Sequence, residues 1–167
     1  MKFSSEGGFS LAETVIALGV LTTGVIGAAG VLVAGMSNLN SSPSDVIVAQ
    51  KATEAVESVF AARDSKRLIW SQINNVSNGG VFLDGPQPLY KQGNDGIVNT
   101  ADDAAAGIET LDLPNQQIQL TAYTRQIVIA DVVGENGNLR KITVNITYQN
   151  GNTNRTYTLV TYISAFA

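Results

Sequence analysis

A glycine pair and one carboxylate open the most apolar part of the chain, in the stretch GGFSLAETVIALGVL. Gly8 has no side chain, so the backbone there can lie extended without a steric penalty. Glu13 follows the glycine pair by five positions and carries a charge at the start of a long apolar run. A carboxylate in such a run is costly and usually has a partner of opposite charge.

Glu13 also has a local explanation. Ser10 and Glu13 form the pattern S-x-x-E ahead of an apolar run, which is typical of a capping box at the start of a helix. A carboxylate in the first helical turn also interacts favourably with the helix dipole. A cap and a charge partner are compatible roles, so the sequence leaves both open.

The apolar run is long enough to cross a membrane. Residues 14–36 contain no charge over 23 positions, and a helix of that length spans about 35 Å, against a hydrocarbon core of ~30 Å. A secretory signal peptide has an apolar run of only ~7–15 residues. A simple anchor fits the length, but it explains neither Glu13 nor the small residues that let helix backbones approach closely. These are Gly19, Gly24, Gly27, Ala28, Ala29, Gly30, Ala34 and Gly35.

The stretch GGFSLAETVIALGVLTTGVIGAAGVLVAG closely resembles the class III signal of type IV prepilins and of type II secretion pseudopilins. That signal is a short polar leader ending in Gly, then an aromatic residue or Met, a Glu at the fifth mature position and a long apolar run. Within this superfamily the segment looks most like the PilV-type minor pilins. It departs from them in having Ala12 where Ile is common and Thr22-Thr23 in the middle of the helix.

The resemblance implies a leader peptide over residues 1–8 and a transmembrane and filament-core helix over residues 9–36. A prepilin peptidase and N-methyltransferase would cut after Gly8 and methylate Phe9. Glu13 would neutralise the N-terminal amine of a neighbouring subunit. The other implied partners are further pilin subunits and the pilus assembly platform.

The resemblance also implies a location. The chain would be inserted once in the bacterial inner membrane, with its head facing the periplasm, and would reach an extracellular filament or pilus tip after assembly. Lys2 and the amino terminus, offset by Glu6, agree with a cytoplasmic N-terminus.

After the apolar run the sequence predicts a hinge and a globular head. Residues 37–44, SNLNSSPS, are polar and contain Pro43, so we expect a bend or unwound segment there. Residues 45–72 are predicted to form an amphipathic helix, because apolar side chains recur at helical spacing. These side chains are Val48, Ala52, Ala55, Val56, Val59 and Phe60.

The rest of the head, within residues 45–167, divides into an irregular part and a sheet. Residues 73–115 contain Asn-Gly-Gly, Gly-Pro and further turn signals. Residues 116–165 alternate apolar and polar side chains around two turn clusters, which predicts an antiparallel sheet of three or four strands. We therefore expect an α+β fold, in which the second half of a long N-terminal helix packs on this sheet.

The stretch GNDGIVNTADD, residues 93–103, concentrates hard oxygen ligands of the kind that Ca²⁺ prefers. Its candidate ligands are Asp95, Asn99, Asp102 and Asp103. The spacing is not that of an EF-hand, but the stretch resembles acidic Ca²⁺ loops, including those of the major pseudopilins. The alternative is a solvated loop with Asx-turns and no ion.

Composition narrows the function. A net charge of −4 and a pI of about 4.6 argue against nucleic-acid binding. The chain has no His and no Cys, so most nucleophile and general-base arrangements are missing, and we expect no enzymatic activity and no required cofactor. The leading expectation is a structural minor pilin. The alternatives are a type II secretion pseudopilin and a membrane-tethered, β-rich binding or adhesion module.

Overall fold

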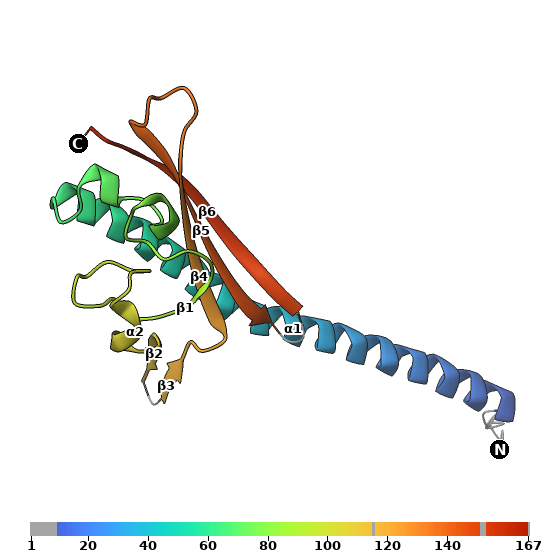
Figure 1. Ribbon diagram of the computed structural model, residues 1–167. Coiled ribbons are helices and arrows are strands. Elements are labelled where there is room, and N and C mark those ends of the chain that lie inside the picture. Colours follow the sequence, from blue (N-terminus) through green and yellow to red (C-terminus); the bar gives the residue numbers. More distant parts are fainter. Residues whose placement is uncertain (1–9, 115, 151–152, 167) are drawn as a thin grey trace, which may run out of the picture. The chain divides into compact units, whose positions relative to one another are not determined.

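The computed structural model describes residues 10–114, 116–150 and 153–166, and for residues 37–43, 113 and 116 it describes the backbone alone. One long helix, α1 (Leu11–Asp64), precedes a set of short turns and strands (Figure 1). In chain order these are η1 (Trp70–Gln72), η2 (Val76–Asn78), β1 (Gln87–Pro88), α2 (Asp103–Ala106), β2 (Thr110–Leu113), β3 (Gln116–Gln119), β4 (Tyr123–Asp131), β5 (Leu139–Asn150) and β6 (Thr153–Ser164).

The chain forms two compact units, Met1–Pro43 and Ser44–Ala167. The second unit, called the head below, has two main layers. The part of α1 after Ser44 lies against one face of a four-stranded antiparallel sheet (Figure 1). The α+β class and the four-stranded antiparallel sheet are therefore confirmed.

The core of the head forms where the predicted helical stripe meets the predicted strands. The helix contributes side chains three or four residues apart, and the strands contribute every second residue, as the two geometries require. From α1 the buried side chains are Val48, Ala52, Ala55, Val59 and Ala62, and from β4 and β5 they include Ile127, Ile129, Ile142, Val144 and Ile146. Val56 and Phe60 are half-buried at the margin of this core.

The sheet has the order β1-β4-β5-β6, and all its neighbours are antiparallel. The last three strands, β4, β5 and β6, lie within residues 116–165, where the sheet was predicted. The fourth strand is β1, which lies outside that range. Residues 116–119, at the start of the range, instead form β3, which pairs with β2 in a separate two-stranded sheet. The prediction was wrong in this part, because strand pairing depends on contacts far apart in the chain.

The helix predicted over residues 45–72 ends earlier, at Asp64. Lys66 has a φ of 58°, in the left-handed region that stops a right-handed helix. The N–H of Leu68 then bonds to the carbonyl of Ala62 at 3.1 Å, which closes the end of the helix. Trp70 consequently lies in the turn η1 and not in a helix.

The backbone of residues 37–44 is helical and belongs to α1. The unwound form of the predicted hinge is therefore wrong, while a bend there stays a prediction. Pro43 has no N–H, so it removes one bond from the helical ladder. Long helical stretches on both sides make continuation less costly than ending the helix and nucleating another.

Candidate functional site: a capped apolar helix and an acidic loop

The first candidate site is the N-terminus of α1. The backbone N–H of Glu13 donates to the hydroxyl of Ser10 at 3.2 Å, and a carboxylate oxygen of Glu13 accepts from the N–H of Ser10 at 3.5 Å. The predicted capping box is therefore present. Its hydrogen bonds leave the negative charge of Glu13 without a basic partner among the residues that the structure describes.

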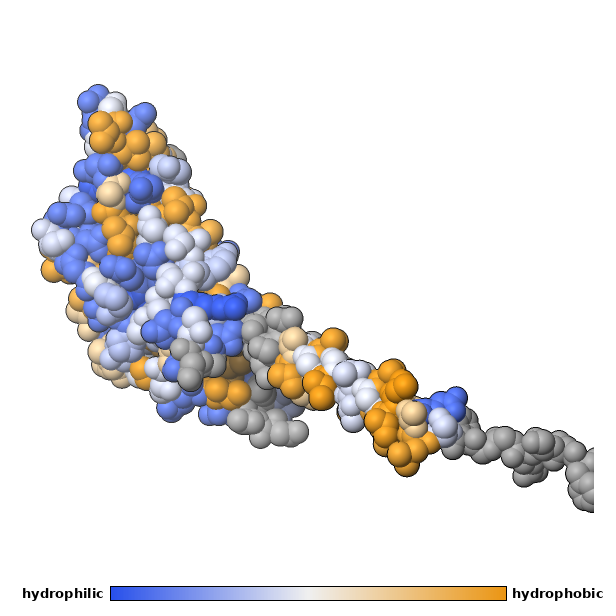
Figure 2. All heavy atoms as spheres, turned by 90° about the vertical axis from the view of Figure 1, so that its right-hand side faces the viewer, coloured by the Kyte–Doolittle hydropathy of each residue, from blue (hydrophilic) through white to orange (hydrophobic). Residues whose placement is uncertain are grey.

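The helix behind this cap is suited to a membrane. Leu11–Met36 is a helical segment of 26 residues with a mean hydropathy of 2.2, and none of it is buried by the rest of the chain. Figure 2 shows the apolar side chains that dominate its surface. By length and composition it can cross a bilayer. The predicted cleavage residues Gly8 and Phe9 lie outside the described residues, so the cut stays a prediction.

The hydroxyls of Thr22 and Thr23, in the middle of this helix, need no outside partner. The hydroxyls of Thr22 and Thr23 both donate to the carbonyl of Gly19, at 2.9 and 3.1 Å. Backbone and side-chain polar groups in lipid must be satisfied within the protein. The Thr22-Thr23 pair, which departs from the usual pilin pattern, is therefore compatible with a membrane segment.

The second candidate site is the loop over residues 93–103. It brings together Asp95, Asp102 and Asp103, whose nearest carboxylate oxygens lie within 4.8 Å of one another. Asn99, the fourth predicted ligand, donates its backbone N–H to Asp103 and its side-chain amide to the carbonyl of Leu83 at 3.1 Å. The sequence thus predicted the cluster of carboxylates, but Asn99 also holds the loop to a neighbouring segment.

Each carboxylate of this cluster organises the loop backbone. Asp95 accepts from the N–H of Ile97 at 2.8 Å, which is the geometry of an Asx-turn. Asp102 accepts from the Thr100 hydroxyl at 2.7 Å, and this bond holds the pKa of Asp102 below its usual range. Asp103 accepts from the N–H groups of Gly93 and Asn99. One Asx-turn, at Asp95, is therefore present in the structure.

Arg125 is a partner of the acidic loop that was not predicted from the sequence. Its side chain is 1% exposed and that of Asp103 is 2% exposed, and a guanidinium nitrogen of Arg125 lies 3.7 Å from a carboxylate oxygen of Asp103. Burial raises the pKa of Asp103, and its N–H donors and Arg125 oppose that rise. Burial also lowers the pKa of Arg125. Because Arg125 shares its strand face with Ile127 and Ile129, its alternation with them was the signal for a buried position.

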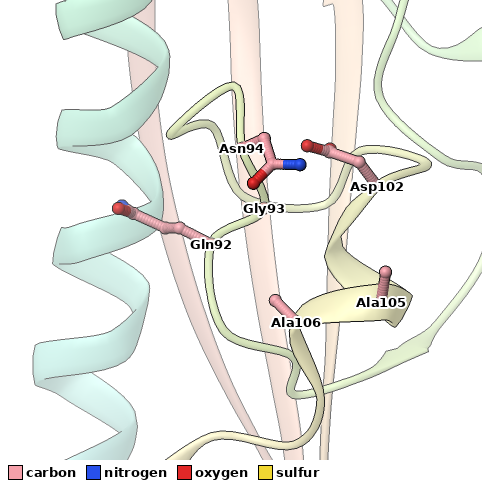
Figure 3. Close-up of a pocket in the computed structure, with 6 residues that line it drawn as sticks. All are labelled: Gln92, Gly93, Asn94, Asp102, Ala105 and Ala106. Atoms are coloured by element: carbon pink, nitrogen blue, oxygen red, sulfur yellow. The ribbon is translucent and has the colours of Figure 1, made fainter.

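A small hollow lies beside Asp102. It has a volume of about 160 Å³ and is lined by Gln92, Gly93, Asn94, Asp102, Ala105 and Ala106. Figure 3 shows the side chains of Asn94 and Asp102 directed toward each other, with Ala105 and Ala106 on α2 nearby. A Cβ atom at Gly93 would lie 2.3 Å from the carboxylate of Asp102, so a larger residue there would displace that side chain.

The donor set of the loop fits Ca²⁺, which takes about six to eight oxygen ligands from carboxylates and backbone carbonyls. Asp95, Asp102 and Asp103 supply carboxylate oxygens close enough to share one ion. Arg125 already places a positive charge beside Asp103, so an ion would depend mainly on Asp95 and Asp102. Calcium at this loop stays a prediction.

If the loop holds Ca²⁺, the ion should stabilise the folded chain. At a concentration of 100 times Kd it would add about 2.7 kcal/mol, which raises Tm by several degrees for a domain of this size. Thermal unfolding of the full chain with Ca²⁺ and with a chelator measures this shift. Asp95→Asn is the matched variant, because Asn keeps an acceptor for the Ile97 N–H but loses the negative charge. This variant should show no Tm shift with Ca²⁺. If Ca²⁺ and chelator leave the Tm of the native chain unchanged, the loop binds no Ca²⁺.

Comparison with protein-family models, curated proteins and solved structures found no match to this chain.

Proposed function

We propose that this chain is a type IV pilin-like subunit, most similar to a minor pilin, that works as a structural part of a filament. Residues 1–8 would be its leader and residues 9–36 its filament-core helix. The observation that supports this most is the position of Glu13, which heads an apolar helix of membrane length and has no positive partner among the described residues of its own chain.

The charge of Glu13 matters because the surroundings are apolar. A carboxylate at the centre of a membrane helix costs roughly 2.5–3.5 kcal/mol on insertion scales, and less near a helix end. A cap alone would not require a full charge, since Gln also completes a capping box. A neighbouring subunit that supplies a positively charged N-terminal amine would account for the carboxylate.

The mature N-terminus tests this proposal directly. We expect mass spectrometry of the native protein to find a chain that begins at N-methylated Phe9. Gly8→Leu should block the cut, because a side chain would then enter the peptidase site, whereas Gly7→Leu should leave it intact as a matched control. A native chain that begins at Met1 or near Ala34 would favour a membrane-tethered binding module and reject the pilin proposal.

Within the same superfamily, a type II secretion pseudopilin remains the alternative. It shares the processing chemistry of Gly8 and Phe9 and the pairing chemistry of Glu13, so the N-terminus does not separate the two. Genes next to this one that encode either pilus or secretion components would separate them.

A further inference from the structure

The head protects one edge of its sheet. On the β4 side, the two residues of β1 pair with Thr124 and Arg125. Beyond β1, the buried side chain of Asn75 donates to the carbonyl of Ile127 and accepts from the N–H of Ile129, both at 2.8 Å. The Asn75 amide thus satisfies two backbone groups of β4 beyond the two residues that pair with β1.

The opposite edge, formed by β6, has no such cover among the described residues. β6 pairs with β5 over 12 residues, and no other described strand pairs with it. Every second residue of an antiparallel edge strand directs its N–H and C=O away from its partner. Outside β5, the described residues provide one bond to this backbone, from Arg63 to the carbonyl of Ser164 at 3.0 Å.

The sequence of β6 lacks the usual features that keep edge strands apart. Natural edges carry Pro, Lys, bulges or inward charges that block pairing with another strand. β6 reads TNRTYTLVTYIS, with no Pro, no Lys and no acid, and its register with β5 is unbroken. Its outer face also exposes Val160 and Tyr162, which are 48% and 53% accessible. This edge is therefore a template for an added strand.

The charge of the β5–β6 hairpin indicates what kind of strand would add. Residues 136–167 contain Arg140, Lys141 and Arg155 and no acid, although the whole chain has a net charge of −4. Arg140 is paired with Asp131, and in the described part of the chain neither Lys141 nor Arg155 forms an ion pair. A second copy would bring the same basic hairpin to this edge, so charge favours a different, acidic partner.

We propose that the free edge of β6 binds an extended, acidic segment of a partner protein, which joins the sheet as its next strand. Backbone hydrogen bonds would supply affinity, and alternate side chains would supply specificity. Ala130, Lys141 and Tyr162 form one cross-strand row that ends at this edge. The row lines a hollow of about 260 Å³ together with Asp131, whose carboxylate is paired with Arg140. A Glu of the added strand opposite Tyr162 would extend this row. Its aliphatic carbons would pack on the Tyr162 ring, and its carboxylate would point toward Lys141.

Hydrogen exchange of the full chain in detergent micelles tests this proposal. The probe is a synthetic peptide of about ten residues that alternates Glu and Val, and the matched control peptide alternates Lys and Val. We expect the acidic peptide to slow exchange of the outward amides of β6 about tenfold, by turning exposed donors into bonded ones. The basic peptide should leave the exchange of these amides unchanged.

Two sets of variants sharpen the test. Lys141→Glu combined with Arg155→Glu should reverse the preference between the two peptides. Leu159 and Val160 are neighbours on β6, so the N–H of one points toward β5 and the N–H of the other points outward. Of the two variants Leu159→Pro and Val160→Pro, the one that removes the outward N–H should keep the β5–β6 ladder and the fold but lose peptide binding.

Three results would overturn the proposal. Equal protection by both peptides would mean that charge does not select the partner. Protection by neither peptide would mean that the edge is not a binding site. Protection of β6 in the chain without peptide that disappears on dilution would show that a second copy covers the edge.

Discussion

Replacing Arg125 with Met is expected to lower the free energy of unfolding of the head by about 3 kcal/mol or more, because breaking a buried ion pair leaves the other charge uncompensated. The charge left behind would be that of Asp103, whose oxygens also accept the N–H groups that shape the acidic loop. Chemical unfolding of the full chain, monitored by a spectroscopic signal that reports on the head, measures this free energy of unfolding.

The pH dependence of the Arg125→Met variant separates a charge effect from a packing effect. Burial already raises the pKa of Asp103, and removing the guanidinium should raise it further. A carboxyl whose pKa is higher in the folded than in the unfolded chain favours folding less as pH rises above its unfolded value of about 3.9. The deficit of the variant should therefore be larger at about pH 8 than at about pH 4.

Arg125→Lys is the matched control for this prediction. It keeps a positive charge near Asp103 but loses the planar fork that reaches the carbonyl of Tyr90 at 3.4 Å. We expect it to lose clearly less stability than Arg125→Met. If the Met variant is as stable as the native chain at the higher pH, the ion pair does not hold the loop to the sheet.

This ion pair also illustrates which parts of the fold could be predicted from sequence. The apolar stripe from Val48 to Val59 and the alternation from Ile142 to Tyr148 are local patterns, and both identified the buried faces correctly. Arg125 was in phase with the buried Ile127 and Ile129, but an alternation rule based on apolar residues passes over a basic side chain. Recognising it required knowing that Asp103 lies against the same face.

The features that the sequence did not predict are long-range. β1 contains only Gln87 and Pro88, too short for any periodic signal, and it became the fourth strand through its contact with β4. Asn75 bonds two further backbone groups of β4, of which the Ile127 carbonyl lies 52 positions later in the chain. In both cases a backbone group needs a partner, and only the folded chain brings that partner within reach.

The acidic loop was predicted from its composition, but the groups that contact its carboxylates were not. Its composition predicted a cluster of carboxylates, and Asp95, Asp102 and Asp103 do converge. Composition did not reveal that backbone N–H groups and Arg125 already satisfy much of that negative charge. Residue types alone therefore identify the loop but do not decide between an ion and the protein's own donors.

The second large effect is expected at Glu13, where the structure allows capping and charge to be tested separately. Glu13→Gln should keep the reciprocal hydrogen bonds with Ser10, because Gln also completes a capping box, but it removes the charge. Under the proposed function, this variant should still be cut after Gly8 but should enter filaments at least about tenfold less well. That factor corresponds to about 1.4 kcal/mol, less than the insertion cost of roughly 2.5–3.5 kcal/mol for an unpaired charge at the helix centre.

Ser10→Ala is the converse variant, since it removes the hydroxyl that accepts from the Glu13 N–H and retains the carboxylate. Losing a cap costs about 1 kcal/mol of helix stability, and the long apolar helix should tolerate this in a membrane or a filament. We therefore expect near-normal incorporation, measured by the amount of each variant in purified filaments relative to the amount processed in the membrane. If the Glu13→Gln chains assemble normally and the Ser10→Ala chains do not, Glu13 acts as a helix cap, and the charge has no role in assembly.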